Sequence, residues 1–167
     1  YDGDCRYGWC GDVYKSKLRL CGAGIGPHTR VRGSVRVEQP WNLTIGEGAA
    51  VGDRAILYCL GPVTIGDHVT ISQGAHVCAG SHDYRDPRMP LIRPTIVIGD
   101  RAWIAADAFV GPGIVVGEGA LLSARGCAMR DLDPWTIYAG NPAERLKARA
   151  RSREGAPDAG AGAPRDE

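Results

Sequence analysis

The chain has 167 residues, which is enough for one domain with a hydrophobic core. Its 20 Lys and Arg side chains against 19 Asp and Glu give a formal net charge of +1, which excludes the strongly basic surface of a nucleic-acid-binding protein and predicts no membrane-surface footprint. No apolar run approaches the ~20 residues that a membrane-spanning helix requires, so we expect no membrane span.

Residues 1–24 carry no repeating pattern, and the stretch DVYKSKLRLCG within them predicts a short helix. We expect this segment to cap the regular structure that follows. Cys5 and Cys10 lie here, and the sequence leaves open whether they pair. The six cysteines form no CxxC motif, which argues against a zinc knuckle, and those in apolar segments are expected to be small buried residues in a reduced, cytoplasmic setting.

Aliphatic residues recur every sixth position between residues 25 and 133. A small residue usually stands four positions after each of them, as in IGEGAA, VGDRAI and IGDRAW. The aliphatic positions form four runs: Ile25, Val31 and Val37; Ile45, Val51 and Leu57; Ile65, Ile71 and Val77; and Ile98, Ile104, Val110, Val116, Leu122 and Ala128.

A helix with its period of 3.6 residues does not hold a six-residue register, and strand alternation does not require a small residue at every repeat. A β-solenoid explains both features, because each hexapeptide is one short strand and one turn, and three of them complete a triangular coil. Coils starting at residues 25, 45, 65, 98 and 116 predict an all-β solenoid of about five coils.

One coil is longer than the others. Its start at residue 65 and the next start at residue 98 are 33 residues apart, against a basic repeat of about 18, so it holds an insertion at residues 80–95. The inserted stretch, SHDYRDPRMPLIRPT, is rich in proline and charge and begins beside His82. Insertions in a solenoid leave the stack as loops, often on a binding face, so we expect a functional loop here.

The repeat fades after Ala128. Residues 134–153 include Asn141 and Pro142 ahead of AERLKARARSR, which predicts a C-terminal helix with Asn141 as N-cap. Residues 154–167, EGAPDAGAGAPRDE, have the composition of a disordered tail.

The tandem hexapeptides, the GSHDY loop and the terminal AGNPAERL together resemble the hexapeptide-repeat acyltransferases, over residues 15–150. The resemblance is strongest to the branch of predicted colanic acid biosynthesis acetyltransferases. It implies a left-handed parallel β-helix, a homotrimer with active sites between subunits, acetyl-CoA as acyl donor, no metal and a saccharide acceptor.

The resemblance also implies roles for individual residues. His82 matches the catalytic base, a suitable role for an imidazole because its pKa is near ~6.5. Asp83 would orient the imidazole or brace the loop, and Tyr84 and Arg85 would contact the acceptor. Residues matching the pantetheine channel are Ala105, Ala106, Ser123 and Ala124, and residues matching the phosphate contacts are Arg130, Arg145 and Lys147.

Two positions depart from the family pattern. Glu144 stands where relatives commonly carry a basic residue. We therefore expect Arg145 and Lys147 to make the phosphate contact instead. Ile56 stands near a position where several sugar acetyltransferases carry asparagine, so we expect a different acceptor pocket.

Other functions remain open at this point. They are an N-acetyltransferase acting on an amino sugar, a metalloenzyme like the gamma-class carbonic anhydrases, and a non-catalytic trimeric scaffold. The metalloenzyme needs three convergent histidines, and we expect His28, His68 and His76 to be ordinary turn or strand residues.

Overall fold

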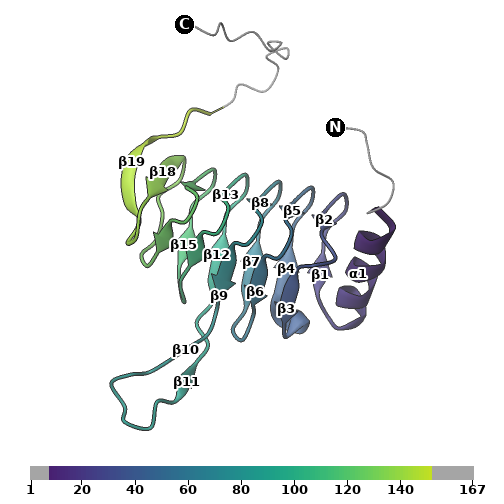
Figure 1. Cartoon of the computed structure of the whole chain (residues 1–167), viewed down its shortest axis with the longest axis horizontal. Helices are drawn as coiled ribbons and strands as arrows, with labels where there is room; N and C mark the ends of the chain where they lie inside the picture. The colour runs from purple at the N-terminus through teal and green to yellow at the C-terminus, as the bar shows by residue number, and fades with distance from the viewer. Residues whose placement is uncertain (1–7, 152–167) are drawn as a thin grey trace, which may run out of the picture.

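The computed structural model describes residues 8–151, with side chains from Asp12 onward. The prediction of a disordered tail, and Cys5 with the side chain of Cys10, lie outside this part. The described chain forms a β-solenoid with three parallel sheets, named here faces A, B and C (Figure 1). The predicted all-β solenoid is therefore confirmed.

The strands of each face stack in chain order along the solenoid. Face A contains β1 (Gly24–Ile25), β4 (Leu43–Ile45), β7 (Val63–Ile65), β12 (Ile96–Ile98) and β15 (Val115–Val116). Face B contains β2 (Arg30–Val31), β5 (Ala50–Val51), β8 (Thr70–Ile71), β13 (Trp103–Ile104), β16 (Leu121–Leu122) and β18 (Thr136–Ala139). Face C contains β3 (Arg36–Glu38), β6 (Ile56–Tyr58), β9 (His76–Cys78), β14 (Phe109–Val110) and β17 (Cys127–Ala128).

The six-residue register produces the core directly. In face A, Ile45, Ile65, Ile98 and Val116 are paired in register from coil to coil, and all four point inward and are buried. The small residues four positions later are buried as well, as Ala49, Ala102 and Ala120 show. Each coil therefore places one or two aliphatic side chains per face inside and a small side chain at the corner, where the interior is narrow.

The insertion leaves the stack between β9 and β12, at the corner that links face C to face A. It forms a hairpin in which β10 (Ser81–His82) pairs antiparallel with β11 (Leu91–Ile92). Figure 1 shows the hairpin projecting from the middle of the solenoid, away from its body. The expectation that residues 80–95 leave the coil as a loop is confirmed.

The two ends of the solenoid are covered differently. Helix α1 (Gly8–Leu20) lies against the first coil, and the short 3-10 helix η1 (Pro40–Asn42) joins β3 to β4. At the other end, β19 (Glu144–Ala148) pairs antiparallel with β18. The predicted C-terminal helix is therefore wrong. The exposed edge of the last parallel strand offers unpaired backbone groups, and pairing with it outweighs the helical propensity of ERLKA.

Candidate active site

His82 lies at the end of β10 with an exposed side chain. Its Nδ1 is 2.5 Å from the carbonyl oxygen of Met89, on the returning limb of the hairpin. Because a carbonyl oxygen can only accept a hydrogen bond, Nδ1 is the donor in this contact, and in the neutral imidazole the free lone pair is on Nε2. Met89 has φ 50°, an uncommon backbone conformation for a residue other than glycine. In the neutral tautomer that this contact favours, Nε2 is therefore the ring nitrogen that can accept a proton.

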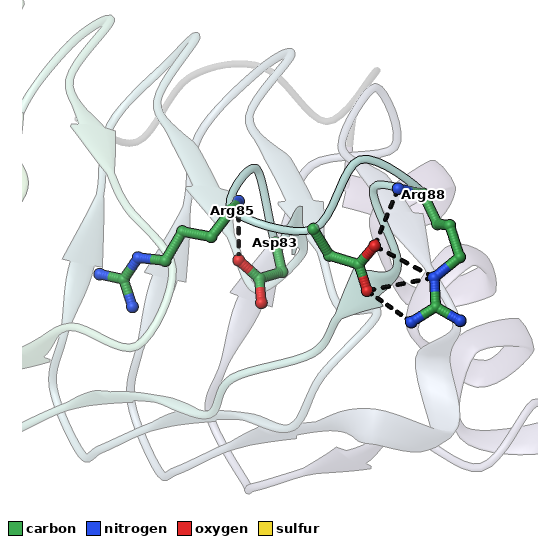
Figure 2. A network of polar contacts seen from close by, with 4 residues as sticks. Asp83, Arg85 and Arg88 are labelled. Atoms are coloured by element: carbon green, nitrogen blue, oxygen red, sulfur yellow. Dashed lines mark hydrogen bonds and ion pairs between the residues drawn. The ribbon is translucent and has the colours of Figure 1, made fainter.

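Asp83 is tied to the hairpin turn. Its Oδ1 accepts a hydrogen bond from the backbone N–H of Arg85 at 3.0 Å, as Figure 2 shows. Its own N–H donates to the carbonyl oxygen of Pro90 at 2.9 Å. Within residues 8–151, no hydrogen bond or ion pair joins this carboxylate to His82, so its observed contacts are those of a turn-bracing side chain.

The tip of the hairpin is held by Asp86 and Arg88. The Arg88 guanidinium donates to both carboxylate oxygens, with Nη2 2.7 Å from Oδ2, and its backbone N–H donates to Oδ1 at 2.9 Å (Figure 2). The side-chain hydrogen bond from Arg88 lowers the pKa of Asp86 below its usual value, and the backbone hydrogen bond from Arg88 adds a smaller effect in the same direction. Tyr84 is exposed nearby, with the Arg85 guanidinium 5.8 Å from its ring centroid.

The four small residues expected along the pantetheine lie together, at the corner between faces B and C in two successive coils. The strands before them pair Ile104 with Leu122, and the Arg125 N–H donates to the carbonyl oxygen of Ala106 at 2.8 Å, so the corners stack directly. We call this set the small-residue ledge: Ala105, Ala106, Ser123 and Ala124. Ala105 is buried, whereas the other three have accessible surface.

Trp103 stands one residue before this corner on β13, with part of its ring exposed. Its Nε1–H donates to the hydroxyl of Ser72 in the preceding coil at 2.9 Å. This bond fixes an aromatic surface on the outside of face B.

The three predicted phosphate-binding residues are all exposed, near the C-terminal end of the solenoid. Arg130 follows β17, while Arg145 and Lys147 lie on β19 opposite Tyr138 and Ile137. Arg145 and Lys147 therefore lie on a strand rather than on the helix that the sequence predicts.

One chain does not bring the histidine and the ledge to the same corner. The hairpin with His82 leaves from the corner between faces C and A, and the small-residue ledge occupies the corner between faces B and C. No hydrogen bond or ring contact connects the two groups among the described residues.

The sequence did not predict the environment of His76, on the outer surface of face C. Its ring lies edge-on between Tyr58 and Phe109, with centroid distances of 6.4 and 5.3 Å, and its Nε2 is buried without a hydrogen-bond partner within residues 8–151. Burial, and to a lesser extent the charge of Arg36, lowers the pKa of His76. A histidine at an outward repeat position gives no sequence indication of these neighbours, which come from other coils.

The described part of the chain offers no set of side chains that could bind a metal ion. No group of three or more His, Cys, Asp or Glu side chains converges among residues 8–151. His28 and His68 lie exposed at corner turns with φ 55° and 54°.

The chain is similar to known acetyltransferases in sequence and in fold. No protein-family model matches the chain. It is 42% identical over 135 residues to the Escherichia coli (strain K12) protein named "Putative colanic acid biosynthesis acetyltransferase WcaF", and the match covers 81% of this chain and 74% of that protein. The chain belongs to the hexapeptide-repeat acetyltransferase family. It is therefore an acyltransferase, and the predicted family is confirmed.

Solved structures show the same fold at lower identity. The hexapeptide-repeat acetyltransferase VCA0836 of Vibrio cholerae superposes with a TM-score of 0.79 at 24% identity, covering 84% of this chain and 82% of that one. Galactoside acetyltransferase, solved in complex with coenzyme A, gives 0.73 at 18% identity over 89% and 84% of the two chains. A chloramphenicol acetyltransferase of Klebsiella aerogenes is 41% identical over 58 residues, which are 35% of this chain and 28% of that protein.

Proposed function

We propose that this acetyltransferase transfers acetyl from acetyl-CoA to a hydroxyl of a saccharide or saccharide precursor, with His82 as general base. The observation that carries the proposal is the hydrogen bond from His82 Nδ1–H to the Met89 carbonyl oxygen, which leaves Nε2 as a proton acceptor. Acetyl-CoA as donor is supported by a related V. cholerae structure, which is a complex with acetyl-CoA.

The proposed reaction is a direct transfer. The acceptor hydroxyl attacks the thioester carbonyl carbon as its proton passes to His82 Nε2, forming a tetrahedral oxyanion. The oxyanion collapses, the carbon–sulfur bond breaks, and the proton on His82 moves to the leaving sulfur to give free CoA. A backbone N–H at a coil corner is the expected hydrogen-bond donor to the oxyanion.

In this proposal the small-residue ledge binds the pantetheine arm of the cofactor, and the basic residues bind its phosphates. Small side chains at Ala106, Ser123 and Ala124 leave the backbone accessible to the narrow pantetheine arm, and Ala105 contributes to the same corner although its side chain is buried. The cations that we propose to bind the phosphates are Arg130, Arg145 and Lys147, which are all exposed. Asp83 holds the turn beside the base, and Tyr84 with Arg85 provides the proposed acceptor contacts.

We propose a homotrimer because one chain leaves its site incomplete. The hairpin that carries His82 projects from the solenoid at a different corner from the ledge, so a neighbouring subunit is needed to bring a base to a cofactor (Figure 1). A hairpin of two-residue strands is also marginal by itself and is stabilised when a neighbour covers it. The left-handed winding and a cytoplasmic setting belong to this same proposal.

Acylation of an amine is the second candidate. AntD of Bacillus cereus, whose solved structure is described as that of an N-acyltransferase, shares the fold with a TM-score of 0.69 at 22% identity, covering 82% of this chain and 89% of that one. The base chemistry is the same for both acceptors, so the product distinguishes them.

The test is an acceptor panel with acetyl-CoA, scored by CoA release and by product mass. We expect turnover with saccharide hydroxyls. Alkaline hydroxylamine should then remove the acetyl group from the product, because it cleaves esters. A product that keeps its acetyl group under this treatment would be an amide and would replace the O-acetyltransferase with the N-acetyltransferase. Calorimetric titration is expected to give about one acetyl-CoA per chain, and a folded protein without saturable binding would contradict the proposal.

A further inference from the structure

Charge is segregated along the solenoid, although the whole chain is nearly neutral. Residues 12–36 contain six of the 20 basic side chains and one of the 19 acidic ones, a local charge of +5 in a chain of net +1. Three of these cations lie on α1 and three on the first coil. The net value of +1 is therefore an average over a basic N-terminal end and a remainder with net negative charge.

Helix α1 uses one side to dock on the first coil. The Tyr14 hydroxyl donates to the Val35 carbonyl oxygen at 2.7 Å, and Lys15 Nζ donates to the Thr29 carbonyl oxygen at 2.9 Å. Leu18 is buried on the same side, and the Arg19 guanidinium reaches the carbonyl oxygen of Ile25 at 2.9 Å. The docked side thus has its polar and apolar groups satisfied.

The opposite side of α1 carries a short outer stripe of two exposed apolar side chains with a lysine between them, which no described residue covers. Positions 13, 17 and 20 fall on one helical face because they are four and three residues apart. Val13 is 48% exposed and Leu20 is 88% exposed, with Lys17 between them. A helix packed only on its coil gains nothing from apolar side chains on its outer face.

An exposed tryptophan lies near the C-terminal end of α1. Trp41, in η1, is 64% exposed, and its Cβ would lie 2.9 Å from a Cβ placed at Gly22, directly after α1. Trp41 and Leu20 therefore flank the same turn at the N-terminal end of the solenoid. We call the outer stripe and this residue the N-terminal patch: Val13, Lys17, Leu20 and Trp41.

We propose that the N-terminal patch docks on a bilayer surface that carries anionic phospholipid. Leucine, valine and tryptophan suit the interface between headgroups and acyl chains, and the surrounding cations are attracted to lipid phosphates. Lys17 and Arg30 have no ion pair within residues 8–151, so both are available for that attraction, whereas Lys15 lies 2.8 Å from Asp12.

A second copy of the chain fits the patch less well, because a two-fold contact would bring the same positive charges together. The binding would be peripheral, since no helix among the described residues is both long and apolar enough to cross a membrane. Docking through α1 leaves the His82 hairpin and β19 away from the bilayer, because they lie in the middle and at the far end of the solenoid (Figure 1). This inference does not depend on the acetyl acceptor.

The test is co-sedimentation of the full chain with vesicles of phosphatidylcholine containing about 30 mol% phosphatidylglycerol, against vesicles of phosphatidylcholine alone. We expect binding to the anionic vesicles only, weakened by added salt. One positive charge near such a surface corresponds to about a fivefold change in affinity, so Lys17→Glu is expected to weaken binding by ~10-fold or more. A double variant, Leu20→Ser with Trp41→Ser, is expected to weaken it by a similar factor.

The matched controls are Leu146→Ser and Arg125→Glu, which alter an exposed apolar side chain and an exposed basic side chain away from α1. Both are expected to bind vesicles as the unchanged protein does, and circular dichroism checks that every variant is folded. Binding that is absent, that is insensitive to the Leu20 and Trp41 changes, or that is weakened equally by the controls would overturn the proposal. Sedimentation velocity tests whether a second copy of the chain binds the N-terminal patch instead. Self-association that is lost in the patch variants would assign the patch to a second copy.

Discussion

The sharpest consequence of the six-residue register is a difference between two neighbouring valines of β15. Val116 points into the core and is 1% exposed, whereas Val115 points outward and is 45% exposed. Val116 pairs in register with the buried Ile98 and bridges to Leu132 of the next coil. Val116→Ala and Val115→Ala remove the same two methyl groups from opposite sides of one strand.

The two variants are expected to lose different amounts of unfolding free energy, by a factor of several. Removing two buried carbons costs ~1.6 kcal/mol at about 0.8 kcal/mol each. A residual cavity of about 40 Å³ adds about 1 kcal/mol, so Val116→Ala is expected to lower the free energy of unfolding by about 2.5 kcal/mol. The side chain of Val115 loses much less contact, and its replacement is expected to cost within about 0.5 kcal/mol.

The assay is urea unfolding followed by circular dichroism, with both variants at the same protein concentrations. The difference between their unfolding free energies is the measured quantity. Equal losses for the two variants, or a larger loss for Val115→Ala at every concentration, would refute the inward and outward assignment of the hexapeptide.

Three further predictions concern other parts of the solenoid. Gly119→Ala is expected to lower the thermal midpoint, at a cost of ~1–3 kcal/mol, because Gly119 has φ 63° and a Cβ there would lie 2.5 Å from the Trp135 ring. Because burial lowers the pKa of His76, the folded protein binds fewer protons than the unfolded chain, so its stability should fall as the pH drops below about 6.5. His76→Phe should lessen the loss in thermal midpoint between pH 7.5 and 5.5. An unchanged loss of thermal midpoint would contradict this reading. Arg149 donates from Nη1 to the carbonyl oxygens of Arg101 and Gly119 at 3.1 and 3.0 Å, so Arg149→Ala should speed hydrogen exchange in β18 and β19 by ~10-fold, with the middle coils unchanged.

The sequence was sufficient for the solenoid because the repeat carries its own redundancy. Every coil places the same residue types at the same positions, so the inward register of Ile98, Ile104 and Val110 could be read without knowing the packing. The insertion could be located for the same reason, since any excess over the repeat has to leave the stack. Periodicity carries no information on how such an insertion folds, and the hairpin register comes from the structure.

The failures arose where a segment depends on its neighbours rather than on its own pattern. ERLKA has helical propensity, but the unpaired edge of β18 recruits it as a strand. The acceptor for His82 Nδ1 was not predictable either, because the Met89 carbonyl is turned by a positive φ that methionine rarely adopts.

The most direct measurement compares His82→Asn with the matched variant His68→Asn, in the presence of the acceptor that gives the fastest CoA release. His68 is exposed at a corner turn with φ 54°, a conformation that asparagine tolerates, so its replacement controls for loss of an imidazole outside the hairpin. We predict that both variants bind acetyl-CoA within about twofold of the unchanged protein in a calorimeter. His82→Asn should lose ~100-fold to 10,000-fold in turnover, as expected for removal of a general base, and His68→Asn should lose little. Turnover by His82→Asn within about tenfold of the unchanged protein, with cofactor binding intact, would contradict the assignment of His82 as the base.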